Sequence, residues 1–205
     1  DADCFASVVP MTSRALPQIF ADWFATRGWA PREHQLALLR KAEAEEDVLL
    51  IAPTGAGKTL AGFLPSLIAL APPRRETLRH GRLHTLYISP LKALTVDIER
   101  NLEIPIAEMR LGIRVETRTG DTSPSKRQRQ RRDPPDILLT TPEQVALLLA
   151  SPDARFLFAD LKRVIVDELH AIAGSKRGDL LCLDLARLRT IAPRMRATGL
   201  SATVR

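Results

Sequence analysis

The sequence predicts an α/β fold in which a mostly parallel sheet carries helices on both faces. The 205 residues are 45% hydrophobic and 26% charged, an ordinary globular composition that excludes a wholly disordered or fibrous chain. Short apolar runs alternate along the chain with longer amphipathic segments. This alternation is typical of buried strands connected by helices, and such sheets bind ligands at the carboxyl ends of their strands.

The first elements are predicted from residue spacing. Apolar residues recur at helical intervals from Leu16 to Thr26, and Gly28 follows where a helix would end. A second helix is expected over 32–45, because Pro31 suits a helix start and leucines recur among the charges that follow. The apolar run over 48–52 predicts a buried strand, and another helix is expected to open near residue 58.

The later elements continue the same alternation. Strands are expected over 85–89, 115–119, 137–140, 164–166 and 197–201. Helices are expected over 91–103, 142–150 and 179–191, and the polar segment 123–132 is either a helix or a loop. The chain begins without methionine and stops directly after a strand-like piece, so we expect it to be the front part of a longer protein.

Charge and cysteine usage narrow the class of protein. The net charge of +6 is frequent in nucleic-acid-binding domains, but 24 of the 30 cations are arginine, a bias that genome composition also produces. Cys4 and Cys182 lie far apart, which excludes zinc ribbons and disulfide frameworks and favours a reducing compartment. No apolar stretch reaches the ~18 residues of a membrane span, and a soluble intracellular protein without membrane association is expected.

The segment 52–59 reads A-P-T-G-A-G-K-T and lies between a predicted strand and a predicted helix, the context of a phosphate-binding loop. Gly55 and Gly57 let successive N–H groups converge on phosphate oxygens, and the helix N-terminus adds positive potential. Lys58 is placed to reach the terminal phosphates of ATP, and the Thr59 hydroxyl to ligate Mg²⁺. The other candidate ATP-binding residues are Pro53, Thr54 and Ala56. The alternative is a glycine-containing turn before a buried helix.

A second apolar strand runs into paired carboxylates, about 110 residues after the phosphate loop. Asp167 is placed to hold Mg²⁺, and Glu168 to polarise a water that attacks the γ-phosphate. His170, two residues later, is either a buried structural histidine or a functional one. Together with Lys58, these three residues are the candidate catalytic set.

Seven sequence blocks, in this order, resemble those of a superfamily-two helicase of the DEXH-box kind, over residues 29–205. Pro31 to Gln35 resembles the adenine-reading glutamine motif, with Gln35 as the reader, and the phosphate loop has the family's usual form. Three blocks resemble motifs that contact the nucleic-acid backbone; their candidate residues are Ser89, Pro90, Lys92, Thr119, Gly120, Thr141 and Pro142. The D-E-L-H segment is the DEXH box, and Ser201, Ala202 and Thr203 resemble the motif that couples hydrolysis to movement. The residues of these blocks are most similar to those of Lhr-type helicases and, within that group, to those of bacterial ligase-associated DEXH-box helicases.

The resemblance implies a RecA-like P-loop fold, with a leading segment over 1–28 and the first of two RecA-like domains over 29–205. The second domain, which would supply transition-state arginines, is not encoded in this sequence, so the fragment is expected to turn over poorly. It further implies ATP and Mg²⁺ as cofactors, single-stranded nucleic acid as partner with DNA favoured, a place in DNA repair beside a ligase or nuclease, and a bacterial cytoplasmic location. His170 would couple the DEXH box to Ser201 or to the second domain.

Other interpretations of the same residues stay open, and one is excluded because its accompanying motifs are missing. A nucleotide-gated binding or remodelling module without strand separation would carry the same motifs. Ser89 and Lys92 also match the S-x-x-K spacing of acylating serine enzymes, but the accompanying motifs are missing. Without the resemblance, Gln35 reads as a solvated residue on a charged helix. The cation-rich run 126–132, like the loop 74–82, is either a solvated face or an extra nucleic-acid contact.

Overall fold

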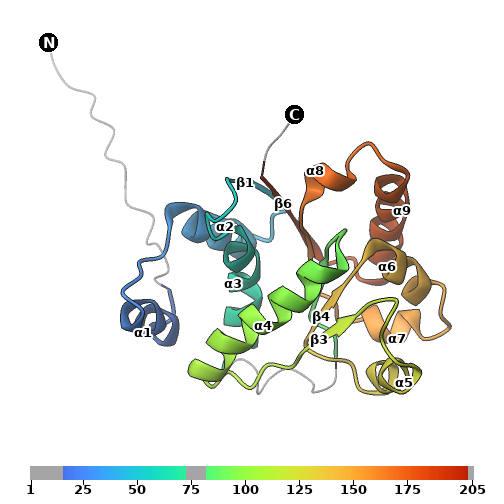
Figure 1. Cartoon of the computed structure of the whole chain (residues 1–205), viewed down its shortest axis with the longest axis horizontal. Helices are drawn as coiled ribbons and strands as arrows, with labels where there is room; N and C mark the ends of the chain where they lie inside the picture. The colour runs from blue at the N-terminus through green and yellow to red at the C-terminus, as the bar shows by residue number, and fades with distance from the viewer. Residues whose placement is uncertain (1–15, 73–81, 203–205) are drawn as a thin grey trace, which may run out of the picture.

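The computed structural model describes residues 16–72 and 82–202, and Thr203 and most of the basic loop 74–82 lie outside these ranges. Six strands form one sheet in which every pair is parallel (Figure 1). In spatial order the strands are β1 (Val48–Ile51), β6 (Arg196–Ser201), β5 (Arg163–Val166), β2 (Thr85–Ile88), β4 (Ile137–Thr140) and β3 (Val115–Arg118). The predicted parallel sheet is confirmed, with each strand within one residue of its expected bounds.

Helices cover both faces of the sheet, as predicted (Figure 1). One face packs on α1 (Gln18–Thr26), α2 (Glu33–Glu43), α3 (Lys58–Leu70) and α4 (Lys92–Glu108). The other packs on α6 (Pro142–Leu149), α7 (Ala154–Phe158), α8 (Leu169–Ile172) and α9 (Lys176–Ile191). The polar segment forms helix α5 (Pro124–Arg132), which the Ser123 side chain caps by accepting a hydrogen bond from the Lys126 N–H.

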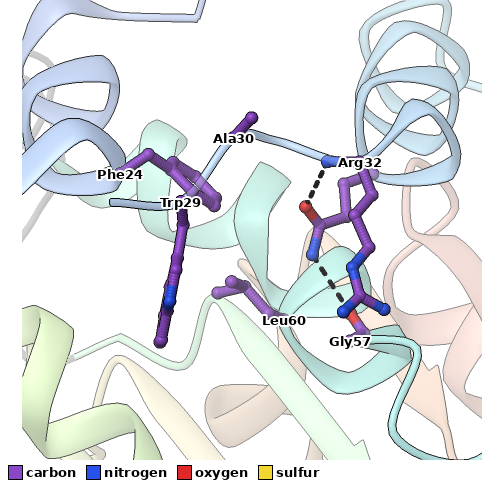
Figure 2. A pocket seen from close by; sticks show the side chains of 7 residues that line it. Phe24, Trp29, Ala30, Arg32, Gly57 and Leu60 are labelled. Carbon is purple, nitrogen blue, oxygen red and sulfur yellow. Dashed lines mark hydrogen bonds between the residues drawn. The ribbon is translucent and has the colours of Figure 1, made fainter. Parts of the chain in front are cut away.

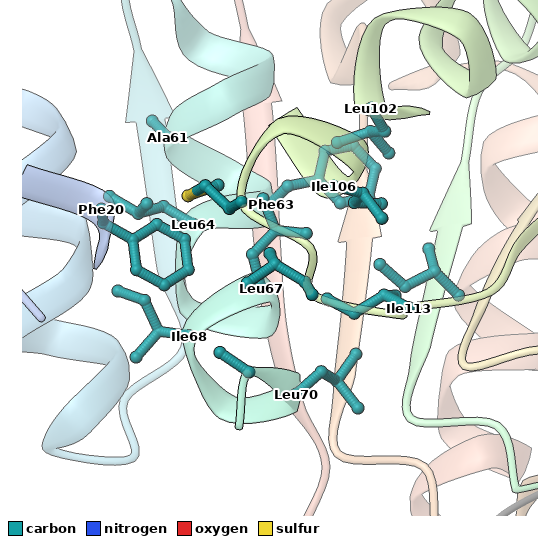
Figure 3. Packing of buried hydrophobic residues seen from close by; sticks show 14 of the residues in the cluster. Phe20, Ala61, Phe63, Leu64, Leu67, Ile68, Leu70, Leu102, Ile106 and Ile113 are labelled. Atoms are coloured by element: carbon teal, nitrogen blue, oxygen red, sulfur yellow. The ribbon is translucent and has the colours of Figure 1, made fainter. Parts of the chain in front are cut away.

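Alternating side chains of the central strands divide the core into two clusters. Tyr87 and Ile165 face the first cluster, and their neighbours Leu86 and Val164 face the second. Figure 3 shows how the first cluster interleaves side chains of α1, α3 and α4, among them Phe20, Phe63 and Leu102. Strands buried on both sides, such as β2, β4 and β5, need apolar residues on both faces and therefore appear in the sequence as apolar runs. The prediction that 48–52 is a buried strand is wrong for one side of β1, because this strand lies at the edge of the sheet and its Leu49 and Ile51 are 54% and 49% exposed.

The helices depart from the prediction at four places. The sequence does not predict α7 and α8, because five- and four-residue helices are too short to show a period. Helix α4 continues through Pro105 to Glu108 rather than ending at residue 103. Helix α9 begins at Lys176, three residues early, because Ser175 caps it. None of the described helices combines the length and apolar composition that crossing a membrane requires.

Strand register aligns the ends of four strands. Arg118, Thr140, Ile88 and Val166 occupy one row across β3, β4, β2 and β5. The residues that follow this row are Thr119, Thr141, Ser89 and Asp167. Three segments that the sequence predicts to contact a nucleic-acid strand therefore leave the sheet at the same edge as Asp167, the first acidic residue of the DEXH box.

Candidate nucleotide and nucleic-acid site

The phosphate-binding loop joins β1 to α3 in the predicted context. Gly55 and Gly57 have φ values of +80° and +76°, a left-handed conformation in which a side chain is strained. Gly57 precedes the first residue of α3, so the loop ends at a helix N-terminus, where unpaired N–H groups favour anions. Thr59 is the second residue of that helix. The loop therefore has the left-handed glycines and the helix N-terminus that a phosphate-binding loop needs.

Lys58 turns back into its own loop. Its Nζ donates to the Ala52 carbonyl at 2.6 Å, and the residue is only 7% exposed. The ammonium group is therefore satisfied by a backbone oxygen of the loop. A phosphate oxygen that entered the loop would be a charged replacement for this neutral acceptor.

Gln35 is packed against the phosphate loop rather than solvated, so the interpretation of a solvated glutamine is wrong. It is 3% exposed, accepts from the Arg32 N–H at 2.9 Å and donates to the Gly57 carbonyl at 3.4 Å (Figure 2). A Cβ on Gly57 would lie 2.9 Å from the Gln35 Nε2, so a side chain there would displace the Gln35 amide. Arg32 donates to the Gly55 carbonyl at 3.3 Å. The glutamine segment and the loop are thus joined at two points.

A pocket of about 380 Å³ opens beside Gln35 and is largely apolar on its other side. Phe24, Trp29 and Leu60 line it (Figure 2). Trp29 is 53% exposed, and the Arg27 guanidinium lies 5.2 Å from the centre of its ring. Trp29 was not among the candidate site residues predicted from the sequence, because no local pattern indicates that it lines a pocket.

Asp167 is held by two hydrogen bonds at the end of β5. Its carboxylate accepts from the Tyr87 hydroxyl at 2.6 Å and from the Glu168 N–H at 2.8 Å, and the residue is 5% exposed. Burial and the Asp167 charge raise the pKa of Tyr87 far above its ordinary value, so the hydroxyl remains a donor. Tyr87, the only tyrosine, was not selected from the sequence, although a buried tyrosine in a central strand usually needs a polar partner.

Glu168, His170 and Ser201 form a short chain of contacts. The His170 Nδ1 lies 3.4 Å from the Glu168 carboxylate and 3.2 Å from the Ser201 hydroxyl. The His170 side chain is 38% exposed, so the interpretation as a buried structural histidine is wrong. Glu168 has a φ of +48°, an uncommon conformation for a residue with a side chain, and it precedes helix α8. The contact expected between the DEXH box and Ser201 is present.

The donor set fits magnesium bound together with phosphates. In the described ranges no group of three His, Cys, Asp or Glu side chains could hold a metal without help. Magnesium commonly takes one or two carboxylates plus phosphate oxygens and waters. Asp167 and the Thr59 hydroxyl are an all-oxygen pair of this kind.

The three predicted strand-contacting segments present few exposed side chains. Ser89, Thr119 and Thr141 are buried to 0%, 7% and 4% exposure, and Pro90 and Pro142 are also buried. Lys92 and Gly120 are exposed, and the Lys92 Nζ lies 3.1 Å from the Asp121 carboxylate. These segments therefore offer mainly backbone groups and one lysine at the edge of the sheet.

Helix α5 is not a simple solvated face. Arg129 donates to both carboxylate oxygens of Glu116, at 3.0 and 2.9 Å, and Gln130 is buried against the same carboxylate. Arg127 donates to the Gly120 carbonyl at 2.6 Å. Arg131 and Arg132 are exposed. The run is consequently divided into cations that hold the β3 end in place and cations that face solvent.

Comparison with known proteins gives a consistent family. A family model described as DEAD/DEAH box helicase matches residues 32–205. The chain is 43% identical over 218 residues to the Lhr helicase/uracil glycosylase of Escherichia coli (strain K12), covering 96% of this chain and 14% of that protein. It is 42% identical over 193 residues to the ATP-dependent helicase Lhr-Core of Methanocaldococcus jannaschii, covering 89% of this chain and 23% of that protein. The chain spans less than a quarter of the length of these relatives.

Solved structures show the same fold. The Mycobacterium smegmatis helicase Lhr bound to ssDNA and AMP-PNP matches with a TM-score of 0.83 at 42% identity, over 91% of this chain and 25% of that one. The DUF1998 helicase MrfA bound to DNA and AMPPNP matches with a TM-score of 0.77 at 30% identity, over 92% of this chain and 26% of that one. The predicted RecA-like fold and the predicted likeness to Lhr-type helicases are confirmed. The chain belongs to the DEAD/DEAH box helicase family.

Proposed function

We propose that this chain is the ATP-hydrolysing motor domain of a helicase or translocase that moves along single-stranded DNA. One observation carries the proposal: the phosphate loop, the acidic pair and three strand-contacting segments leave one parallel sheet at the same edge. Ligands of such sheets bind at that edge. Related proteins named as ATP-dependent helicases, and Lhr bound to ssDNA and AMP-PNP, support it.

We assign residues 29–205 to the first RecA-like domain and 1–28 to a leading segment. A second RecA-like domain of the same protein would close over the nucleotide and supply arginines to the transition state. Without it, the chain binds nucleotide weakly and turns it over slowly. A role in DNA repair and a ligase or nuclease partner rest on the family resemblance alone.

The adenine and phosphates of ATP have distinct sites in this proposal. Adenine enters the pocket beside Gln35, whose two observed bonds leave one N–H and one oxygen lone pair of its amide for the base. The triphosphate enters the loop formed by Pro53, Thr54, Gly55, Ala56 and Gly57. Lys58 exchanges the Ala52 carbonyl for a terminal phosphate oxygen.

Thr59 and Asp167 would hold the magnesium ion together with the phosphates. Bound there, the ion would neutralise phosphate charge as it develops. Glu168 acts as the general base that orients the attacking water and accepts its proton. His170 passes the state of this site to Ser201, Ala202 and Thr203 through its contact with the Ser201 hydroxyl.

In this proposal, single-stranded DNA lies along the same edge of the sheet and is held at its phosphates and sugars. Backbone groups near Ser89, Pro90, Thr119, Gly120, Thr141 and Pro142, together with Lys92, supply the contacts. Such contacts carry no base information, which suits a motor that must step along any sequence.

The test is the ATPase rate of a longer chain that carries the second domain, measured with and without a dT oligonucleotide. Stimulation by the oligonucleotide supports the motor, and separation of a tailed duplex then distinguishes a helicase from a translocase. Nucleotide binding without turnover would instead support a nucleotide-gated binding or remodelling module.

A further inference from the structure

Arg177 bridges two of the segments that are proposed to contact single-stranded DNA, one after β2 and one after β4. From the first turn of α9, its Nε donates to the Glu143 carboxylate at 2.6 Å and its second terminal nitrogen donates to the Pro90 carbonyl at 3.0 Å. Glu143 is the second residue of α6, directly after Thr141 and Pro142. Burial opposes ionisation of Glu143, but the hydrogen bond from Arg177 helps to hold its pKa below the ordinary value. One guanidinium therefore fixes the spacing between the ends of β2 and β4.

The segment that carries Arg177 is locked to the helix that follows the acidic pair. The Ser175 hydroxyl donates to the Ile172 carbonyl at 2.6 Å and accepts from the Gly178 N–H at 3.2 Å. A Cβ on Gly178 would lie 2.5 Å from the Ile172 carbonyl oxygen, so only glycine allows α8 and α9 to approach this closely. The C-terminus of α8 is thus in direct contact with the first turn of α9.

The other end of α8 belongs to the nucleotide site. Glu168 precedes its first residue, and the Ala171 N–H donates to the Glu168 carbonyl at 2.8 Å. His170, within α8, contacts both Glu168 and Ser201. A continuous set of short contacts thus runs from the acidic pair through α8 and the start of α9 to the two strand segments.

We propose that Arg177 is a positioning residue that couples the nucleotide site to the strand site through α8. The inference rests on the proposed motor function and deepens it. When bound nucleotide moves Glu168 and α8, Arg177 moves Pro90 and Glu143 together. The two DNA-contacting segments that follow β2 and β4 then change their contacts with the DNA in the same step. A bidentate, planar guanidinium suits this role, because a lysine ammonium could not hold both acceptors in a fixed geometry.

The experiment measures how nucleotide changes strand affinity in the whole protein. The affinity for a fluorescent dT oligonucleotide is measured with and without AMP-PNP, and the ratio of the two constants is the coupling factor. Coupling factors in allosteric proteins are roughly 5- to 150-fold. For Arg177→Ala we expect this factor to fall below about twofold, DNA-stimulated ATPase to fall with it, and basal ATPase to stay unchanged. Arg177→Lys is expected to restore the factor only in part.

A matched control comes from the same helix. Arg187 also donates to a carbonyl, that of Leu149 at 2.9 Å, but it contacts neither strand segment, so Arg187→Ala should leave the coupling factor unchanged. An Arg177→Ala protein with normal coupling and normal stimulation would overturn the positioning role and leave the motor proposal standing. If the unaltered protein shows no stimulation by the oligonucleotide, the proposed function fails, and the coupling role fails with it.

Discussion

The two halves of the sheet build their polar sites differently. In the half formed by β1, β6 and β5, the key side chains bond backbone groups of their own loops: Lys58 donates to the Ala52 carbonyl, and Asp167 accepts from the Glu168 N–H. In the half formed by β2, β4 and β3, the exposed lysine and arginine side chains bond carboxylates, such as Lys92 with Asp121 and Arg129 with Glu116. The first site relies on backbone groups, and the second on pairs of charged side chains.

This difference bears on how each half meets phosphate. The phosphate loop offers N–H groups and one buried lysine, a fixed geometry that suits a single ligand. In the half formed by β2, β4 and β3, Lys92, Arg129 and Arg177 are each paired with a carboxylate, and the exposed pairs contribute little stability and are screened by salt. Because carboxylates already neutralise these cations, the number of arginines overstates the charge available to a strand.

The largest expected effect is on nucleotide hydrolysis, and it is confined to the half of the sheet formed by β1, β6 and β5. Glu168→Gln should lower the ATPase rate of the whole protein by about 10²- to 10⁴-fold, because the amide keeps the shape and loses the base. ATP affinity should stay nearly intact, as measured by equilibrium titration with a fluorescent ATP analogue. Unchanged turnover would remove Glu168 from the mechanism.

Lys58→Ala should come next, with ATP affinity reduced roughly 100-fold through loss of a charged hydrogen bond to phosphate. Affinity for a dT oligonucleotide without nucleotide should not change, which would separate the two halves. Lys41→Ala is the control, since Lys41 is exposed and pairs with Glu46 on the surface. Equal ATP affinity in the Lys58 and Lys41 variants would show that the phosphate loop is misassigned.

Tyr87→Phe tests the seam between the halves, because Tyr87 lies on β2 and bonds Asp167 at the end of β5. Removing the hydroxyl leaves a buried carboxylate oxygen without this donor, which should reduce the free energy of unfolding by about 1–3 kcal/mol. The stacked contact with Phe63, at 5.2 Å, is retained in the variant. Urea unfolding measures the change, and a stability equal to that of the parent would mean that the bond ties nothing together.

The smallest expected effect sharpens the picture of the strand half. Arg131→Gln or Arg132→Gln should each flatten the slope of log affinity against log salt by about 0.7 on a dT oligonucleotide, if the cation meets a phosphate. Arg129→Gln should change the slope less, since Glu116 already neutralises Arg129. Slopes that fall equally in all three variants would contradict the division of the α5 cations into those that hold the end of β3 in place and those that face solvent.

How much of the fold and of the candidate site the sequence could predict depends on how far apart in the chain the contacting residues lie. The phosphate loop, the acidic pair and the six strands are encoded in consecutive residues, so short patterns were sufficient to find them. Gln35 needed the family motif, because its contact with Gly57 joins residues 22 positions apart. Tyr87 and Arg177 were missed because their partners lie 80 and 87 positions away, and no local period indicates such contacts.

The inward turn of Lys58 has a consequence for ligand selection. The Lys58 ammonium is buried and donates to the Ala52 carbonyl, so we expect it to contribute little to binding the phosphodiesters of a DNA strand at the same edge of the sheet. On the proposed function, we expect a ligand that places several phosphate charges within the loop to replace the Ala52 carbonyl. A nucleoside or monophosphate in the pocket beside Gln35 should leave the Lys58 contact intact. The fold would then distinguish two phosphate-bearing ligands at one edge of the sheet by their charge density rather than by their shape.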